Sequence, residues 1–202
     1  EVSHTEGGTE ILRTYAFDFC GAKPNWNSSQ ILEDSLQQVQ SKVGGGEHVL
    51  CALSGGVDST VVGTLLTRAL GSERVHCVFV NNGLLRQNEY EKVLQIYQSF
   101  GLNVRGVDAT DRFLSALDGV EDPEQKRKII GQKFIEVFER CLEQELQNHG
   151  SKIKWLAQGT LYPDVIESVS PRGTSVTIKT HHNVGGLPEK MKLKLIEPLR
   201  EL

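Results

Sequence analysis

The sequence predicts a doubly wound parallel α/β fold, with helices on both faces of the sheet. Short apolar runs typical of buried strands alternate along the chain with segments of helical periodicity. Glycine and polar residues follow directly where the apolar runs end. With 202 residues and 38% hydrophobic content, the chain can build one full α/β domain. In such a sheet we expect ligands to bind at the carboxyl ends of the strands.

The elements follow one another in a regular order. Asn27 or Ser28 is expected to cap a first helix whose apolar positions run to Val43, and the glycines at 44–46 end it. Gly101 is a candidate C-cap of a later helix. Strands are expected at 48–53, 75–80, 104–107 and 154–158, and helices at 60–70, 88–100 and from Asp122 to about Asn148.

The first predicted strand breaks into a glycine turn that opens directly into a helix. The turn reads Ser54, Gly55, Gly56, Val57, Asp58, Ser59, Thr60. The glycines let the backbone approach an anion closely, and a helix N-terminus points unpaired N–H groups at it. Ser54 and Ser59 add hydroxyl donors, whereas Asp58 repels phosphate unless a divalent cation lies between them. These residues together predict a site for a nucleotide polyphosphate with Mg²⁺.

An ordinary βα turn is the alternative interpretation of the same residues. Asp58 and Ser59 would then serve as helix N-caps. The turn lacks the Gly-Lys-Ser/Thr ending of a Walker loop and the G-x-G-x-x-G of a dinucleotide fold. If it binds phosphate, it is a phosphate loop of a different kind.

Composition excludes several classes of partner. A net charge of −4 and a pI near 5.9 give no basic footprint for nucleic acid. The four cysteines are widely spaced, with no C-x-x-C pair, which fits a reducing cytoplasm. No apolar stretch approaches membrane-spanning length, and no signal peptide is visible. We therefore expect a cytoplasmic protein without nucleic-acid or membrane partners.

The strand followed by Ser-Gly-Gly-x-Asp-Ser resembles the pyrophosphatase loop of the N-type ATP pyrophosphatases. Four further segments, in the same order as in that family, resemble GMP synthetase: 80–86, 126–131, 158–168 and 178–188. The resemblance covers nearly everything from Trp26 to Glu197. It implies a Rossmann-like fold of the adenine nucleotide alpha-hydrolase type.

The resemblance also implies a reaction, that of a C–N ligase in guanine nucleotide biosynthesis. The 2-oxygen of xanthosine monophosphate attacks the α-phosphorus of ATP, giving an adenylyl intermediate and Mg-pyrophosphate. Ammonia then displaces AMP to give GMP. ATP and Mg²⁺ are the implied cofactors. The chemistry needs positioning and charge neutralisation more than covalent catalysis.

The resemblance assigns the phosphate end of ATP to residues 54–60, with Asp58 holding Mg²⁺. Asp164 and Glu167 are implied catalytic residues, in contact with substrate or Mg²⁺, and Asp164 is an expected metal ligand. They lie three apart after Pro163, a spacing that suits one face of a first helical turn. The alternative for both carboxylates is simple stabilisation of the helix dipole.

Further roles follow from the other matching segments. Lys179 is implied to neutralise developing negative charge from a flexible lid, and His181 to contact phosphate or the adenylylated base. Arg127 is implied to bind the phosphate of xanthosine monophosphate. The alternatives are a solvated surface loop for the first two and a solvated helix face for Arg127. Asn81 departs from the family, which usually has Asp at this position.

Residues 1–20 resemble the tail of a class I glutamine amidotransferase domain, and 21–27 form a linker. Glu1 matches the Glu of a Cys-His-Glu triad whose other members would lie upstream, so the segment cannot hydrolyse glutamine. The alternative for 1–20 is an exposed N-terminal arm. Residues 28–202 are assigned to the ATP pyrophosphatase domain, without the family's C-terminal dimerisation domain.

The resemblance implies ammonia supplied by a glutaminase domain and a homodimer of the full-length protein. This chain alone is expected to be impaired or to use only free ammonia. Two alternatives remain: a nucleotide-binding module inactive in isolation, and another amide-forming ATP pyrophosphatase such as NAD synthetase.

Overall fold

The computed structural model describes residues 2–24, 27–168 and 193–202, and the chain divides into two compact units, residues 1–34 and 35–202. The first unit contains a 3₁₀ turn (Val2–His4), helix α1 (Gly8–Thr14), a π-helical turn (Tyr15–Phe19) and the start of α2 (Ser28–Lys42). The expectations for this region included no helix before residue 27.

Helix α2 begins where the sequence predicts. Asn27 Oδ1 accepts a hydrogen bond of 2.9 Å from the Gln30 N–H, which confirms Asn27 as its cap. In the same unit, α1 and the π-helical turn carry a row of exposed apolar side chains: Ile11, Leu12, Tyr15, Phe17 and Phe19. Within its own unit this segment has little apolar core, because Gly8 is the only buried residue of α1 and the π-helical turn contains none.

The second unit is built on a parallel sheet of five strands in the order β3-β2-β1-β4-β5. Each neighbouring pair is parallel. The strands are β1 (His48–Leu53), β2 (Val75–Asn81), β3 (Val104–Asp108), β4 (Ile153–Ala157) and β5 (Lys194–Ile196). This arrangement confirms the predicted doubly wound α/β class. The short strand β5 was not predicted.

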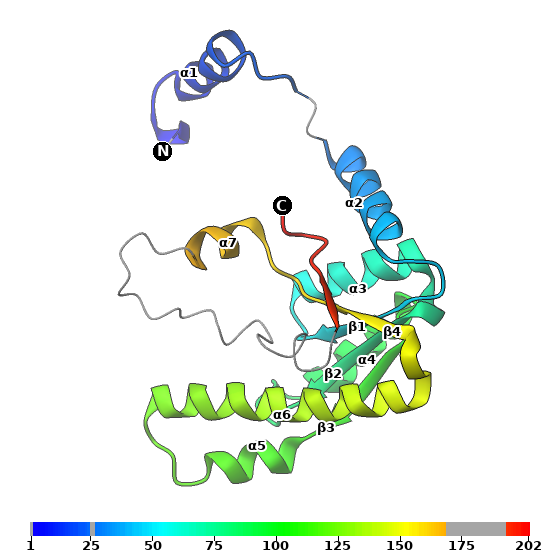
Figure 1. Ribbon diagram of the computed structural model, residues 1–202. Coiled ribbons are helices and arrows are strands. Elements are labelled where there is room, and N and C mark those ends of the chain that lie inside the picture. Colours follow the sequence, from blue (N-terminus) through cyan, green and yellow to red (C-terminus); the bar gives the residue numbers. More distant parts are fainter. Residues whose placement is uncertain (1, 25–26, 169–192) are drawn as a thin grey trace. The chain divides into compact units, whose positions relative to one another are not determined.

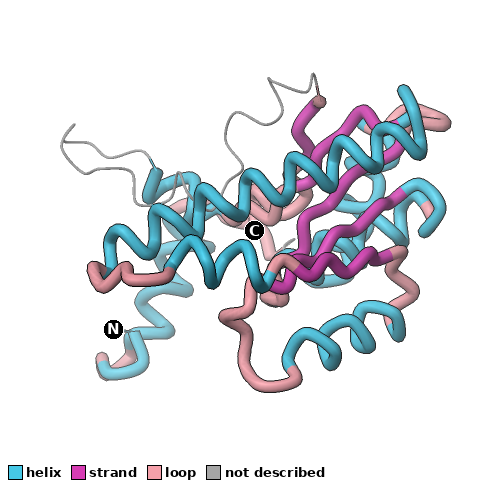
Figure 2. The backbone as a smooth tube through the Cα atoms, turned by 90° about the horizontal axis from the view of Figure 1, so that it is seen from below, coloured by secondary structure: helices cyan, strands magenta, loops and turns pink. Residues whose placement is uncertain are grey.

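Helices connect the strands and cover the sheet on both faces (Figures 1 and 2). The helices on the two faces are α3 (Val57–Leu70), α4 (Glu89–Ser99), α5 (Thr110–Leu117) and α6 (Pro123–His149), and the short α7 (Tyr162–Ser168) follows β4. There are 3₁₀ turns at Ser72–Arg74 and Gly150–Lys152. The predicted α4 and α6 are confirmed within one residue at each end, and Asp122 caps α6 by accepting the Gln125 N–H at 2.9 Å. Helix α5 was not predicted.

Two apolar clusters, one on each face, hold the helices to the sheet. Alternate residues of β1 separate between them, with Val49 and Cys51 in one cluster and Leu50 in the other. The first cluster packs α3, α4 and the last turns of α2 on the sheet, and the second packs α5 and α6. Cys51 and Cys77 are free thiols, each 1% exposed, and pack as small hydrophobic side chains.

Within the described part of the chain, no helix combines the length and apolar character that crossing a membrane requires.

Candidate nucleotide-binding site

The candidate site lies at the point where the strand order of the sheet reverses, between β1 and β4. Chain connections run from β1 outward to β2 and β3 on one side, while β4 and β5 lie on the other. The turn after β1 and the turn after β4 therefore flank the switch point of a parallel sheet, where ligands bind in this architecture. The first of these turns is the Ser54–Gly56 segment, and the second contains Gly159.

The two turns touch at the level of the backbone. A Cβ added to Gly159 would lie 3.5 Å from both the Asp58 carbonyl carbon and the Ser59 nitrogen. Any larger side chain at 159 would therefore crowd the start of α3. The structure thus brings Gly159 against the turn after β1 and the start of α3 (residues 54–60), hereafter called the nucleotide loop.

The turn after β1 depends on its glycines. Gly55 has φ +85°, a conformation that L residues adopt only with strain. Gly56 is extended (φ −80°, ψ 163°) and is itself the N-cap of α3, without any side-chain cap. Helix α3 consequently begins at Val57, three residues before the predicted start at Thr60. The alternative interpretation of Asp58 and Ser59 as N-caps is wrong, because both lie inside the first turn of the helix.

Hydrogen bonds inside the turn fix its shape. The Ser59 hydroxyl donates to the Gly56 carbonyl at 3.1 Å and accepts the Ser54 N–H at 3.1 Å. Ser54 Oγ lies 3.1 Å from Ser59 Oγ and accepts the Gly56 N–H at 3.3 Å. The Gly55 N–H donates to the Tyr97 hydroxyl at 3.1 Å. The two serine hydroxyls therefore brace the turn, and Tyr97 is a supporting residue that the sequence prediction missed.

The first turn of α3 supplies the anion-binding groups. Thr60 is the first residue whose N–H closes a helical bond, to the Gly56 carbonyl at 3.2 Å. The N–H groups of residues 57–59 precede it, so helix geometry gives them no intrahelical acceptor. Val57 and Asp58 are exposed, which leaves this helix end open to a ligand. Phosphate oxygens suit the N–H groups, and the Asp58 carboxylate is a ligand that Mg²⁺ prefers, so these residues fit Mg-ATP.

Asn81 ends β2, on the other side of β1 from Gly159. Its Oδ1 accepts the Gly83 N–H at 3.0 Å, which forms a side-chain turn after the strand. An aspartate oxygen can accept the same bond. The departure from the family's Asp therefore keeps this turn intact.

Asp164 lies in the first turn of α7, so the helix expected after Pro163 is present. Asp164 Oδ2 accepts the Leu161 N–H at 3.1 Å, a bond that stabilises the start of the helix. Beside Gly159, the buried Thr160 hydroxyl has no hydrogen-bond partner among the described residues. Thr160 is a second residue that the sequence prediction did not single out.

Arg127 stands apart from the loop. It is exposed on the first turns of α6 and forms an ion pair with Glu124 at 3.1 Å. Helix α6 leads through Gly150–Lys152 into the amino end of β4, so its own beginning lies on the carboxyl side of the sheet. A helix of 27 residues is about 40 Å long, whereas a five-residue strand spans about 17 Å. Arg127 therefore lies beyond the strand ends, on the same side of the sheet as the loop.

Four predicted residues are not placed. Lys179 and His181 lie outside the described residues, as does Glu1. The backbone of Glu167 belongs to α7, and its side chain is likewise outside the described part.

A glycine turn and an open helix N-terminus at the switch point of a parallel sheet define a nucleotide-binding α/β protein with the loop of the ATP pyrophosphatases. The chain belongs to the NAD synthase family, because the sequence model of the family described as NAD synthase matches residues 28–151.

Among curated proteins, the chain is similar to GMP synthases over its whole length. It is 63% identical over 202 residues to the "GMP synthase [glutamine-hydrolyzing]" of Bdellovibrio bacteriovorus and covers 39% of that protein. The enzymes of the same name from Nitratidesulfovibrio vulgaris and Aspergillus fumigatus are 56% and 52% identical, and 38% of each is covered. The chain thus spans about two fifths of the length of these relatives.

A solved structure supports the fold. The chain is similar to the NH3-dependent NAD synthetase of Campylobacter jejuni, determined in complex with the nitrate ion, with a TM-score of 0.56 and 16% identity. The match covers 72% of this chain and 62% of that one. At this identity the likeness establishes the shared fold only.

Proposed function

We propose that this chain is the ATP pyrophosphatase part of a GMP synthase and takes part in the ATP-dependent amination of xanthosine monophosphate to GMP. The observation that carries the proposal is the 63% identity to a GMP synthase across all 202 residues, which include the turn and helix start described above. The NAD synthetase structure, by comparison, is 16% identical.

The turn after β1 has the first role, which is to bind the β and γ phosphates of ATP. The N–H groups of residues 57–59 donate to phosphate oxygens, and the partial positive charge of the α3 N-terminus attracts them. Asp58, together with Asp164, would hold Mg²⁺. When bound, the ion would supply positive charge to the leaving pyrophosphate.

The second role is to support transfer of the adenylyl group from ATP to xanthosine monophosphate. The 2-oxygen of xanthosine monophosphate forms a bond to the α-phosphorus while the bond from that phosphorus to the pyrophosphate oxygen breaks. Lys179 neutralises the charge of this step, and His181 contacts the phosphate or the adenylylated base. Glu167 contacts substrate or metal, and Arg127 binds the phosphate of xanthosine monophosphate with its two-pronged guanidinium.

The third role is to support the attack of ammonia on the adenylyl intermediate. This attack forms the C–N bond, releases AMP and gives up a proton. The relatives carry the words "glutamine-hydrolyzing" in their names, so we infer that a glutaminase domain supplies the ammonia. Residues 1–20 are the tail of that domain in this proposal, and the complete protein is a homodimer.

Pyrophosphate release tests the proposal. It should be measured from Mg-ATP and ammonia, with and without xanthosine monophosphate, on the chain joined to the flanking sequence that the relatives carry. The expected result is release only with xanthosine monophosphate, accompanied by GMP. Release with deamido-NAD instead would make the chain an NAD synthetase. Binding of ATP without release on either substrate would reduce the chain to a nucleotide-binding module.

A further inference from the structure

The amino ends of the parallel strands, here called the amino edge of the sheet, lie opposite the nucleotide loop. Three histidines gather at this amino edge. His48 is the first residue of β1, His76 is the second of β2, and His149 is the last of α6. Each offers a ring nitrogen, and these atoms all lie within 4.8 Å of one another. His48 Nδ1 and His76 Nε2 are 2.8 Å apart, and the rings of His76 and His149 are 4.0 Å apart between centroids. Three separate elements thus bring their imidazoles to one point.

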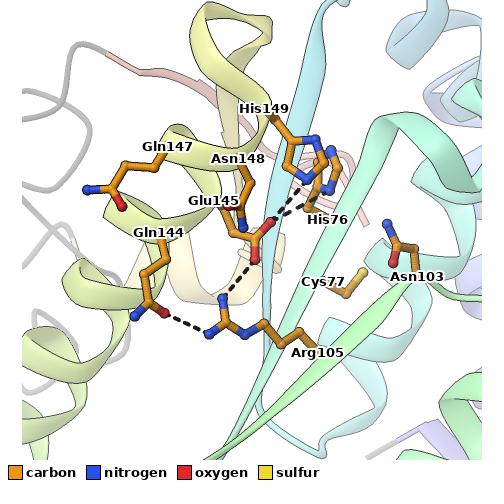
Figure 3. A pocket seen from close by; sticks show the side chains of 9 residues that line it. All are labelled: His76, Cys77, Asn103, Arg105, Gln144, Glu145, Gln147, Asn148 and His149. Carbon is orange, nitrogen blue, oxygen red and sulfur yellow. Dashed lines mark hydrogen bonds and ion pairs between the residues drawn. The ribbon is translucent and has the colours of Figure 1, made fainter.

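A buried carboxylate orients two of the rings. Glu145, one turn before His149 on α6, has a side chain only 9% exposed, and its Oε2 lies 3.4 Å from His149 Nε2 and 3.9 Å from His76 Nδ1 (Figure 3). Its other oxygen accepts a bond of 3.1 Å from Arg105, which also donates to Gln144 at 2.7 Å. The carboxylate is therefore fixed in place and favours N–H groups on the ring atoms that face it.

The charge of Glu145 favours a proton on His76 Nδ1, although their distance of 3.9 Å is too long for a hydrogen bond. In that tautomer Nε2 carries the lone pair, and His48 Nδ1 is then the donor of the 2.8 Å bond, whose direction depends on the ring tautomers. A histidine whose one nitrogen faces a carboxylate while the other is free to coordinate is the usual arrangement around a protein-bound metal. Glu145 thus stands where a supporting carboxylate stands in such sites.

We propose that His48, His76 and His149 form a binding site for a divalent transition metal ion, and that Zn²⁺ is the ion that best suits it. Three imidazole nitrogens with a fourth position open to water are a known ligand set for Zn²⁺. The side chain of His149 is 36% exposed and lines an open pocket of about 560 Å³ together with His76 and Glu145, so an ion can enter from solvent. This proposal does not depend on the proposed function.

Binding requires the three rings to separate and turn, because His48 and His76 are stacked with an interplanar angle of 14° and the ring of His149 lies 4.0 Å from that of His76. Zn–N bonds of about 2.0–2.1 Å put tetrahedral ligand atoms roughly 3.4 Å apart. The closest pair now lies at 2.8 Å, and the set extends to 4.8 Å, so the metal would separate the first pair and draw in the third ring. His48 passes its proton from Nδ1 to Nε2, and the metal takes the place of the shared hydrogen.

Zinc titration by calorimetry on the full chain, stripped of metal with a chelator, tests the site. We expect one Zn²⁺ per chain, and a loss of at least about tenfold in affinity for His149→Ala, because one of three ligands is gone. Glu145→Gln should weaken binding by about 10–100-fold, as removal of a supporting carboxylate does. Co²⁺ should give the visible absorption of a tetrahedral site in the unaltered chain and lose it in His149→Ala.

Two controls make the outcome decisive. Gln147→Ala and Asn148→Ala each remove a polar side chain that lines the same pocket but no imidazole, and both should keep full zinc affinity. Thermal unfolding without metal should show that His149→Ala still folds, and added Zn²⁺ should raise the melting temperature of the unaltered chain more than that of His149→Ala. Equal zinc affinity in the unaltered chain and His149→Ala, or loss of binding in Gln147→Ala and Asn148→Ala, would overturn the proposal.

Discussion

The two edges of the sheet carry polar groups assembled in opposite ways. At the carboxyl edge, the nucleotide loop is made of backbone: a glycine at φ +85°, an extended glycine cap and the N–H groups of a helix start. At the amino edge, three imidazoles and a carboxylate meet, and their positions come from side chains on β1, β2 and α6. The first arrangement suits a large anion, and the second suits a single cation.

The edges also differ in how the sequence encodes them. The loop occupies consecutive residues, so strand, turn and helix can be recognised side by side. The imidazole pair of His48 and His76 joins residues 28 apart, and His149 arrives from the end of a helix of 27 residues. We therefore expect substitutions of the exposed side chains of the nucleotide loop to change nucleotide affinity at constant stability. Substitutions at the amino edge should change stability at constant nucleotide affinity.

The largest expected effect is that of Asp58→Ala on Mg-ATP binding. Asp58 is exposed on the first turn of α3, so its loss leaves the fold intact while removing the carboxylate proposed to share Mg²⁺ with phosphate. We expect a loss of about 100-fold in affinity, equivalent to about 2.7 kcal/mol. Calorimetry with Mg-ATP measures it, and ATP in the presence of a chelator is the matched control. Unchanged Mg-ATP affinity would remove Asp58 from the metal site.

Gly159→Leu should have the next largest effect. Its Cβ fits at 3.5 Å from the α3 backbone, but the atoms beyond Cβ must enter the space at the helix start. Overpacking of this kind shifts the backbone and costs about 1–3 kcal/mol of stability. A shifted helix start no longer presents its N–H groups to phosphate, so we also expect a loss of roughly tenfold in ATP affinity, or about 1.4 kcal/mol of binding free energy. Gly159→Ala is the control and should stay within about threefold, because a contact of 3.5 Å is an ordinary one. If the two variants bind ATP equally well, the turn after β4 does not border the nucleotide.

The sequence predicted what is local and missed what is assembled from distant segments. The bounds of β1 and the capping of α2 by Asn27 follow from adjacent residues, and both are confirmed. The start of α3 was placed three residues late, because the expected helix began only at Thr60, whereas its cap is Gly56, which has no side chain to signal the role. Strand β5 is three residues long, too short for a periodic pattern.

Within the site, the same division holds. The glycine turn was predictable, whereas the bond from the Gly55 N–H to Tyr97 joins residues 42 apart and has no local signal. The histidine cluster has none either, because His48 and His76 each sit singly in apolar strands. They come together only because the parallel register pairs His76 with Leu50 on the adjacent strand. His48 lies two residues before Leu50, and therefore on the same face of β1.

A smaller effect, on stability rather than binding, is expected for Arg105→Ala at the amino edge. It leaves the buried Glu145 carboxylate without its 3.1 Å partner. Breaking a fully buried pair costs about 3–5 kcal/mol, but Arg105 is 44% exposed, so we expect about 1 kcal/mol. Urea unfolding in chelator measures it, and Arg127→Ala, which breaks a pair with Glu124 whose two side chains are 58% and 55% exposed, should cost less. A loss of ATP affinity in Arg105→Ala would show that the two edges are coupled.

The smallest effect is expected for Asn81→Asp, which introduces the residue that is usual at this position in the family that the sequence resembles. The turn at the end of β2 needs an oxygen that accepts the Gly83 N–H, and either side chain supplies one. ATP affinity should therefore change by less than about threefold, under about 0.7 kcal/mol. Asn81→Ala removes the acceptor and should cost about 1 kcal/mol of stability. A gain of ATP affinity well above threefold in Asn81→Asp would mean that a carboxylate at this position acts on the nucleotide or its metal, in addition to that of Asp58.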